Sequence, residues 1–215
     1  MKKTSNITKT PKTNTKQRLI AAAIPLFAKN GYDGVSTAEI CEAAQANIAA
    51  LHYHFKSKEN LYHTIIHQFG TESLASALRI LRKPERLEEV RVRLESFLYE
   101  SVELFLERYD LTRIVQREIE AQVCRHPDLF RSTFHKMFEA LVDFIDAAVK
   151  ARFLSPSYDS AFMAGALFAQ LSSAIKTDPT NRRFFKQTLT DPVYRKKWVE
   201  STVGVFLEGA LPRVK

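Results

Sequence analysis

Glycine and cysteine are scarce in this chain of 215 residues. Only six residues are glycine, and the two cysteines are Cys41 and Cys124. Neither G-x-G-x-x-G nor G-x-x-x-x-G-K-[ST] occurs, which argues against a Rossmann or P-loop enzyme, because those phosphate cradles need glycine where the backbone approaches the ligand. Two cysteines are too few for a disulfide framework. We therefore expect a cytoplasmic protein in a reducing compartment.

Long apolar runs are also missing. No stretch approaches the roughly 20 apolar residues that a membrane-spanning helix needs, and the basic N-terminus is not followed by the apolar segment of a signal peptide. Charged residues make up 26% of the chain and hydrophobic residues 45%, the balance of a globular protein. We expect one or two domains and no membrane partner.

The net charge of +8 is unevenly distributed along the chain. Residues 1–60 hold nine lysine and arginine residues against four acidic ones, a net of +5. A basic N-terminal quarter on a nearly neutral body indicates a polyanionic partner bound at one end. A solvated basic tail would give the same pattern, so charge alone leaves both interpretations open.

Apolar residues spaced three and four positions apart dominate the rest of the sequence. They predict amphipathic helices over 84–108 and 128–153. Residues 180–186 are expected to form a surface connection between helices. No run of strictly alternating apolar residues is bounded by turn residues, so no strand is predicted. The predicted fold class is all-α.

The N-terminal region divides into short helices. A helix predicted over 15–30 ends at the glycine-containing turn 31–34. Ser36 and Glu39 then have the spacing of a capping box, in which each residue bonds the backbone N–H of the other. This box predicts the start of a second helix, which ends near Ala44.

A third short helix is predicted over 47–54, after a break at Gln45-Ala46. Ser57 is placed to cap a fourth helix that begins at Lys58. Three short helices with a tight turn between the second and third make a helix-turn-helix candidate. In that motif the third helix enters the DNA major groove and the second lies across the backbone.

The same stretch, 16–62, resembles the DNA-binding domain of the TetR (tetracycline-repressor) family. The resemblance rests on "AA…LFAKNGYDGVSTAEICEAA" and "HYHFKSKENLY". The string at 47–50 further resembles a CecR-like branch. Two positions depart from the family pattern: Gln45 stands where glycine is common, which implies a negative φ or some strain, and Pro25 predicts a kink in the first helix.

The resemblance implies the domain organisation and the function. We expect a flexible basic arm over 1–15, a TetR-type helix-turn-helix DNA-binding domain over 16–62, and a helical effector-binding and dimerisation domain over 63–215. The expected function is that of a homodimeric repressor released from a pseudo-palindromic operator by a small-molecule effector. Whether the arm contacts DNA is left open.

Candidate DNA contacts follow from residue chemistry and from the family pattern. Asn47 either caps the third helix or contacts adenine, and Thr37 and Lys58 suit phosphate contacts. Leu51 and Phe55 are expected in the core. The predicted DNA-binding residues are Ser36, Thr37, Asn47, Ile48, Ala49, Ala50, His52, Tyr53 and Lys58.

The C-terminal part is expected to bind both a second copy of the chain and an effector. By resemblance, helices over about 159–176 and 191–211 form the homodimer, although intramolecular packing would also explain their patterns. Seven of the 15 phenylalanines fall within 85–153 and could line an effector cavity or simply fill the core. The effector and its contact residues stay unassigned, and no cofactor is expected.

Other functions were weighed against this one. A metal- or redox-responsive regulator on the same scaffold would use His63 and His67, spaced four apart, or Cys124. A basic protein that binds nucleic acid without sequence preference is a further alternative. No arrangement of nucleophile and base indicates an enzyme.

Overall fold

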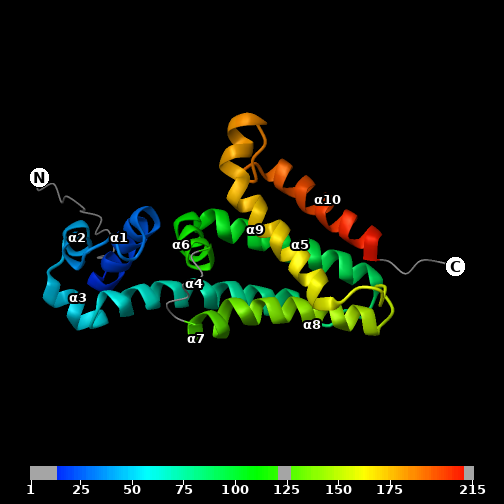
Figure 1. Cartoon of the computed structure of the whole chain (residues 1–215), viewed down its shortest axis with the longest axis horizontal. Coiled ribbons are helices and arrows are strands. Elements are labelled where there is room, and N and C mark those ends of the chain that lie inside the picture. Colours follow the sequence, from blue (N-terminus) through cyan, green and yellow to red (C-terminus); the bar gives the residue numbers. More distant parts are fainter. Residues whose placement is uncertain (1–13, 121–126, 211–215) are drawn as a thin grey trace, which may run out of the picture. The chain divides into compact units, whose positions relative to one another are not determined.

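The computed structural model describes residues 14–120 and 127–210, and every regular element in these two ranges is a helix (Figure 1). The prediction of an all-α fold is confirmed. Two compact units meet between Ile65 and Ile66. Helix α4 (Lys58–Ile80) contributes to both units because it runs through this boundary. None of the described helices is long and apolar enough to span a membrane.

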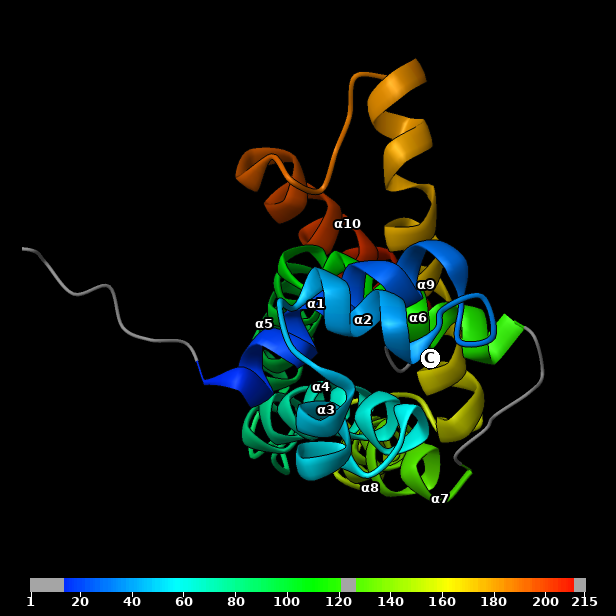
Figure 2. The same cartoon turned by 90° about the vertical axis from the view of Figure 1, so that its left-hand side faces the viewer.

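The first unit contains three short helices and the start of α4. They are α1 (Thr15–Asn30), α2 (Thr37–Ala43) and α3 (Ile48–Phe55), close to the predicted bounds. The three pack against one another, and Figure 2 gives an end-on view of them. Their shared core is formed by buried apolar side chains, including Leu19, Ala23, Phe27, Ile40, Leu51 and Phe55.

Helix α1 runs through Pro25 without interruption. Proline has no N–H to donate to the carbonyl of Ala21. Ala21 is exposed, so water can hydrate that carbonyl in place of the missing bond. The predicted kink therefore does not divide the helix.

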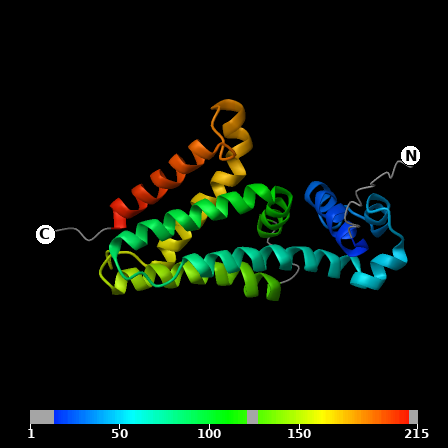
Figure 3. The same ribbon diagram turned by 180° about the vertical axis from the view of Figure 1, so that it is seen from behind.

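The second unit is built from longer helices. Helix α10 lies along α5, and α9 lies along α8 (Figures 1 and 3). The periodic stretches 84–108 and 128–153 are helical as predicted, although the second includes a π-helical turn. Besides the C-terminal part of α4, the elements are α5 (Leu87–Glu107), α6 (Tyr109–Glu120), α7 (Pro127–Phe130), the π-helix η1 (Arg131–His135), α8 (Lys136–Lys150), α9 (Ser160–Phe184) and α10 (Pro192–Ala210).

The prediction of a surface connection over 180–186 was wrong. Helix α9 continues through Pro179 to Phe184. The buried carboxylate of Asp178 accepts hydrogen bonds from the backbone N–H of Leu189 at 2.6 Å and from Oγ1 of Thr188 at 2.9 Å. These bonds fold the following segment back against the helix, an arrangement that local periodicity does not encode.

Candidate functional site: an exposed helix and an aromatic cavity

Helix α2 begins with the predicted capping box. The backbone N–H of Ser36 donates to the Glu39 carboxylate at 2.7 Å, and the N–H of Glu39 donates to the Ser36 Oγ at 3.2 Å. The Ser36 hydroxyl also donates to this carboxylate, and the two Ser36 hydrogen bonds lower the pKa of Glu39. Thr37 is thereby fixed in the first turn of α2, half-buried.

The turn between α2 and α3 carries backbone strain. Gln45 has a φ of 50°, in the left-handed region that favours glycine. The sequence allows either a negative φ or a strained backbone at Gln45. The structure has the strained backbone, at a cost of about 1–2 kcal/mol. The hydrogen bond from the N–H of Ala46 to the carbonyl of Cys41, 2.9 Å long, closes this turn.

Helix α3 is capped by Asn47. Its Oδ1 accepts a hydrogen bond from the N–H of Ala50 at 2.7 Å. The predicted capping role is confirmed. The cap uses the side-chain oxygen of Asn47, which is the hydrogen-bond acceptor of the amide. The Asn47 side chain is otherwise exposed, which leaves its Nδ2 donors accessible to a partner.

The two sides of α3 differ in exposure. Leu51 and Phe55 are buried, as predicted, with exposed fractions of 0% and 5%. On the outer side Ile48 is 50% exposed and Tyr53 is 76% exposed. Exposed apolar and aromatic side chains on so short a helix leave a surface free for a partner. The structure brings the predicted residues of α3 to this side: Asn47, Ile48, Ala49, His52 and Tyr53 are exposed, and Ala50 is half-buried.

His52 is oriented by the end of its own helix. Its Nδ1 lies 2.7 Å from the carbonyl oxygen of Lys56. A carbonyl only accepts, so Nδ1 carries the proton and Nε2 is the nitrogen left for another partner. Lys56 itself ends the helix at a φ of 67°.

Lys58 is placed differently from the other candidates. Its Nζ donates to the carbonyl oxygens of Val35 at 2.8 Å and Tyr32 at 3.0 Å. It also lies 4.2 Å from the centre of the Tyr32 ring. The ammonium group therefore ties the start of α4 to the turn before α2. The exposed cation beside it is Lys56, which sequence reasoning missed because both lysines of Lys-Ser-Lys have equal chemistry.

The metal and redox alternatives gain no support from the described residues. Within residues 14–120 and 127–210, no three His, Cys, Asp or Glu side chains are grouped to hold a metal ion. Cys41 is buried, which raises the pKa of its thiol and keeps it unreactive. Cys124 and residues 1–13 of the predicted arm lie outside the described residues.

A partly open cavity of about 300 Å³ lies between the helices of the second unit. Apart from four polar side chains, those of Thr112, Gln116, His135 and Ser172, its lining is apolar. The charged residues Arg113, Arg117 and Glu118 of α6 do not belong to the described lining. Six phenylalanines from six elements line the cavity: Phe69, Phe105, Phe130, Phe134, Phe138 and Phe168.

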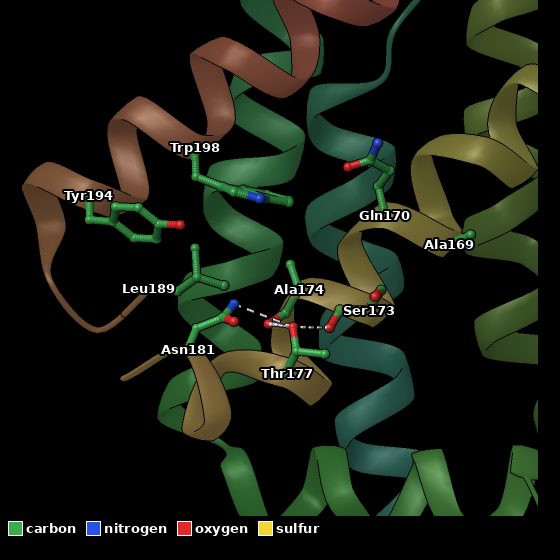
Figure 4. A pocket seen from close by; sticks show the side chains of 9 residues that line it. All are labelled: Ala169, Gln170, Ser173, Ala174, Thr177, Asn181, Leu189, Tyr194 and Trp198. Carbon is green, nitrogen blue, oxygen red and sulfur yellow. Dashed lines mark hydrogen bonds between the residues drawn. The ribbon is translucent and has the colours of Figure 1, made fainter. Parts of the chain in front are cut away.

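A more polar groove of about 440 Å³ lies where α9 and α10 diverge (Figure 4). The Oγ1 of Thr177, one of its lining residues, donates to the carbonyl of Ser173 at 2.9 Å and accepts from Asn181. Trp198 and Tyr194 border the groove from α10. Small and polar side chains on α9 thus face aromatic ones on α10.

A three-helix unit with an exposed third helix, followed by an all-helical second unit, defines a helix-turn-helix regulator. Residues 19–65 match the family model described as "Bacterial regulatory proteins, tetR family". Residues 19–65 therefore carry a DNA-binding domain of the TetR type. No enzyme family is indicated by the matches. The narrower CecR-like resemblance at 47–50 stays a prediction.

Several known regulators are similar to this chain. The transcriptional regulator QacR of Staphylococcus aureus is 42% identical over 53 residues, 25% of this chain and 28% of QacR. The repressor AcnR of Corynebacterium glutamicum is 30% identical over 92 residues, 39% of this chain and 49% of AcnR. The matches therefore span about half or less of these curated relatives.

Solved structures extend the likeness of fold to the second unit. The TetR-family regulator PfmR of Thermus thermophilus has a TM-score of 0.67 to this chain at 21% sequence identity. The match covers 91% of this chain and 100% of PfmR.

Proposed function

We propose that this protein is a homodimeric repressor that binds a pseudo-palindromic operator in double-stranded DNA and is released by a small-molecule effector. The observation that carries the DNA-binding part is the exposed side of α3, whose core-facing residues Leu51 and Phe55 hold it against the unit. Helix α3 is the recognition helix and enters the major groove. The proposed location is the cytoplasm, where the DNA is.

The residues of α3 divide between base and backbone contacts. Ile48, Ala49 and Ala50 contact thymine methyl groups, and the Asn47 amide donates to a base edge. Tyr53 and the Nε2 of His52 lie on the same exposed side and contact the DNA.

The start of α2 and the end of α3 supply the phosphate contacts. Ser36 and Thr37 lie where the free N–H groups of the α2 N-terminus converge on a phosphate. Lys56 supplies an exposed positive charge at the end of α3. Lys58 belongs to the interface by positioning the turn before α2.

Dimerisation is proposed through α9 and α10, over about 159–176 and 191–211. Large apolar side chains are exposed on both helices: Phe162 is 69% exposed on α9, and Val193 and Val205 are 78% and 71% exposed on α10. Large exposed apolar side chains support a protein–protein contact. A two-fold symmetric dimer is expected to read two half-sites about 34–36 Å apart.

The proposal is tested by selecting binding sites from random duplex DNA with the full-length protein. We expect a pseudo-palindromic consensus, a dimer by light scattering, and competition by the selected site at least about a thousandfold better than by random duplex. Equal competition by random duplex would favour the alternative of nucleic-acid binding without sequence preference. A consensus with one half-site bound by a monomer would contradict the dimer.

A further inference from the structure

We propose that the aromatic cavity of the second unit takes an uncharged aromatic compound of one or two fused rings that carries a single hydrogen-bonding group. The inference rests on the proposed function, because it names the class of effector for that repressor. It is carried by the shape, the charge and the unused hydrogen-bonding groups of the cavity.

The apolar lining favours rings over saturated chains. Phe69 lies 5.9 Å from Phe105 and 6.2 Å from Phe134, and both ring pairs are tilted. Phe138 meets Phe168 edge to face at 6.1 Å. Rings held at such angles present both faces and edges to the cavity, and each aromatic contact with a ligand ring stabilises binding beyond the area it buries. A saturated chain gains only the free energy of burying its apolar surface.

The size of the cavity limits the ligand. A volume of about 300 Å³ stands at the lower end of the range for small-molecule sites. One ring or two fused rings fit this space. Larger ring systems would have to displace phenylalanines that pack against each other.

The charge of the lining excludes ions. Among the described lining residues there is no lysine, arginine, aspartate or glutamate. A carboxylate in the cavity would lose much of its hydration without gaining an opposite charge. A cation would gain less from a phenylalanine face than it loses in hydration. His135 in the lining is already paired with the Glu139 carboxylate at 3.3 Å, so this pair offers no free charge to an ion.

The polar groups of the lining indicate one hydrogen bond. Thr112 already donates to the carbonyls of Phe105 and Arg108, at 3.0 and 3.2 Å. The side chains of Gln116 and Ser172 form no hydrogen bond within the described part of the chain. Gln116 has a donor and an acceptor, so it matches a hydroxyl or a ring N–H. Gln116 is half-buried at the cavity, so a ligand hydroxyl or ring N–H would replace the water that its amide can otherwise bind.

The experiment measures direct binding by titration calorimetry with full-length protein and five probes. They are 2-naphthol, naphthalene, 2-naphthoate, 2-naphthyltrimethylammonium and 1-decanol. We expect 2-naphthol to bind at least about tenfold more tightly than either ion and than 1-decanol. Tighter binding of an ion or of 1-decanol, or no binding of 2-naphthol, would overturn the inference.

Variants identify the hydrogen bond. Gln116→Leu should weaken 2-naphthol binding about five- to tenfold and leave naphthalene binding within about twofold. Gln116→Met keeps the length of the side chain and repeats the test if the leucine variant folds poorly. Gln68→Leu, on an exposed position of α4 outside the cavity, is the matched control and should bind both probes like the wild type. Equal losses for both probes in both Gln116 variants would contradict a hydrogen bond from this residue.

A second readout separates this inference from the proposed function. Release of fluorescent operator DNA is followed with the same five probes. If the protein binds no operator, the proposed function fails while calorimetry still decides the ligand class. If the operator binds but an ion or 1-decanol releases it best, the repressor stands and the ligand class is wrong.

Discussion

The two units hold their helices by interactions of different range. In the first unit, Ser36, Asn47 and Ser57 cap helices with bonds to residues three positions away. In the second, Arg195 reaches Glu103 across 92 positions of sequence, and the backbone of Gly70 lies against Thr133. Local changes in the first unit should thus alter one helix, whereas changes in the second should disturb the packing of several. Four pairs of substitutions test this difference.

The largest effect is expected at the inner side of the recognition helix. Leu51→Ala removes a fully buried side chain and should lower the free energy of unfolding by about 2–5 kcal/mol. Ile48→Ala, on the outer side, should change it by no more than about 0.5 kcal/mol while weakening operator binding. Urea unfolding and DNA titration of both variants measure the contrast. Equal destabilisation by both would contradict an outward-facing side of α3.

In the second unit, Gly70→Ala should be destabilising. A Cβ at this position would lie 2.7 Å from the Cβ and Oγ1 of Thr133, so α4 and η1 would have to separate. We expect a loss of about 1–3 kcal/mol in urea unfolding. Gly209→Ala is the control, because open space surrounds that position and alanine favours a helix by up to about 1 kcal/mol. A stable Gly70→Ala protein would show that this contact is not tight.

The two lysines at the end of the recognition helix should have different roles. Lys58 positions the turn before α2, and Lys56 supplies positive charge to the DNA contact. Lys58→Met removes two hydrogen bonds and should cost about 1–2 kcal/mol of stability without changing the salt dependence of operator binding. Lys56→Met should reduce the slope of log K against log salt by about one. A reduced slope for Lys58→Met would instead give Lys58 the phosphate contact that the sequence predicts.

Replacing Asn47 should cost less stability than replacing Leu51, Gly70 or Lys58. Asn47→Ala removes the cap of α3 and should cost about 1 kcal/mol. Asn47→Ser keeps a capping oxygen and should cost only a few tenths, but it lacks the amide donors. Operator titrations then isolate the base contact, since the serine variant should bind more weakly than wild type at nearly unchanged stability. Wild-type affinity in the serine variant would leave Asn47 with the cap alone.

The first unit could be predicted from the sequence almost residue by residue. Caps and turns depend on neighbours along the chain, so Ser36, Glu39 and Asn47 define helix starts without knowledge of the tertiary fold. The role of Lys58 could not be predicted in this way. Its partners Tyr32 and Val35 lie more than 20 positions earlier in the sequence.

The second unit could be predicted only in outline. Periodicity located its helices, yet 180–186 is predicted as a connection because this stretch after Pro179 is too short to show a helical period, whereas α9 continues to Phe184. The Asp178 contacts that fold the chain back span 10 and 11 positions. The phenylalanines of the cavity come from six elements, and no local pattern distinguishes them from those that fill the core.

The π-helical turn η1 has a consequence for the register of the cavity wall. A π-turn holds one more residue than an α-turn, and each residue of an α-helix rotates the chain by about 100°. Deleting Ser132 would convert the segment to a continuous α-helix in which Phe130 stands three rather than four positions before Phe134, its ring neighbour at 5.6 Å. Residues three apart share one face of an α-helix, so the two rings would stay neighbours. The π-turn thus absorbs its extra residue locally, and loss of a single codon here would shorten the helix while the aromatic wall and the buried face of α8 keep their orientation.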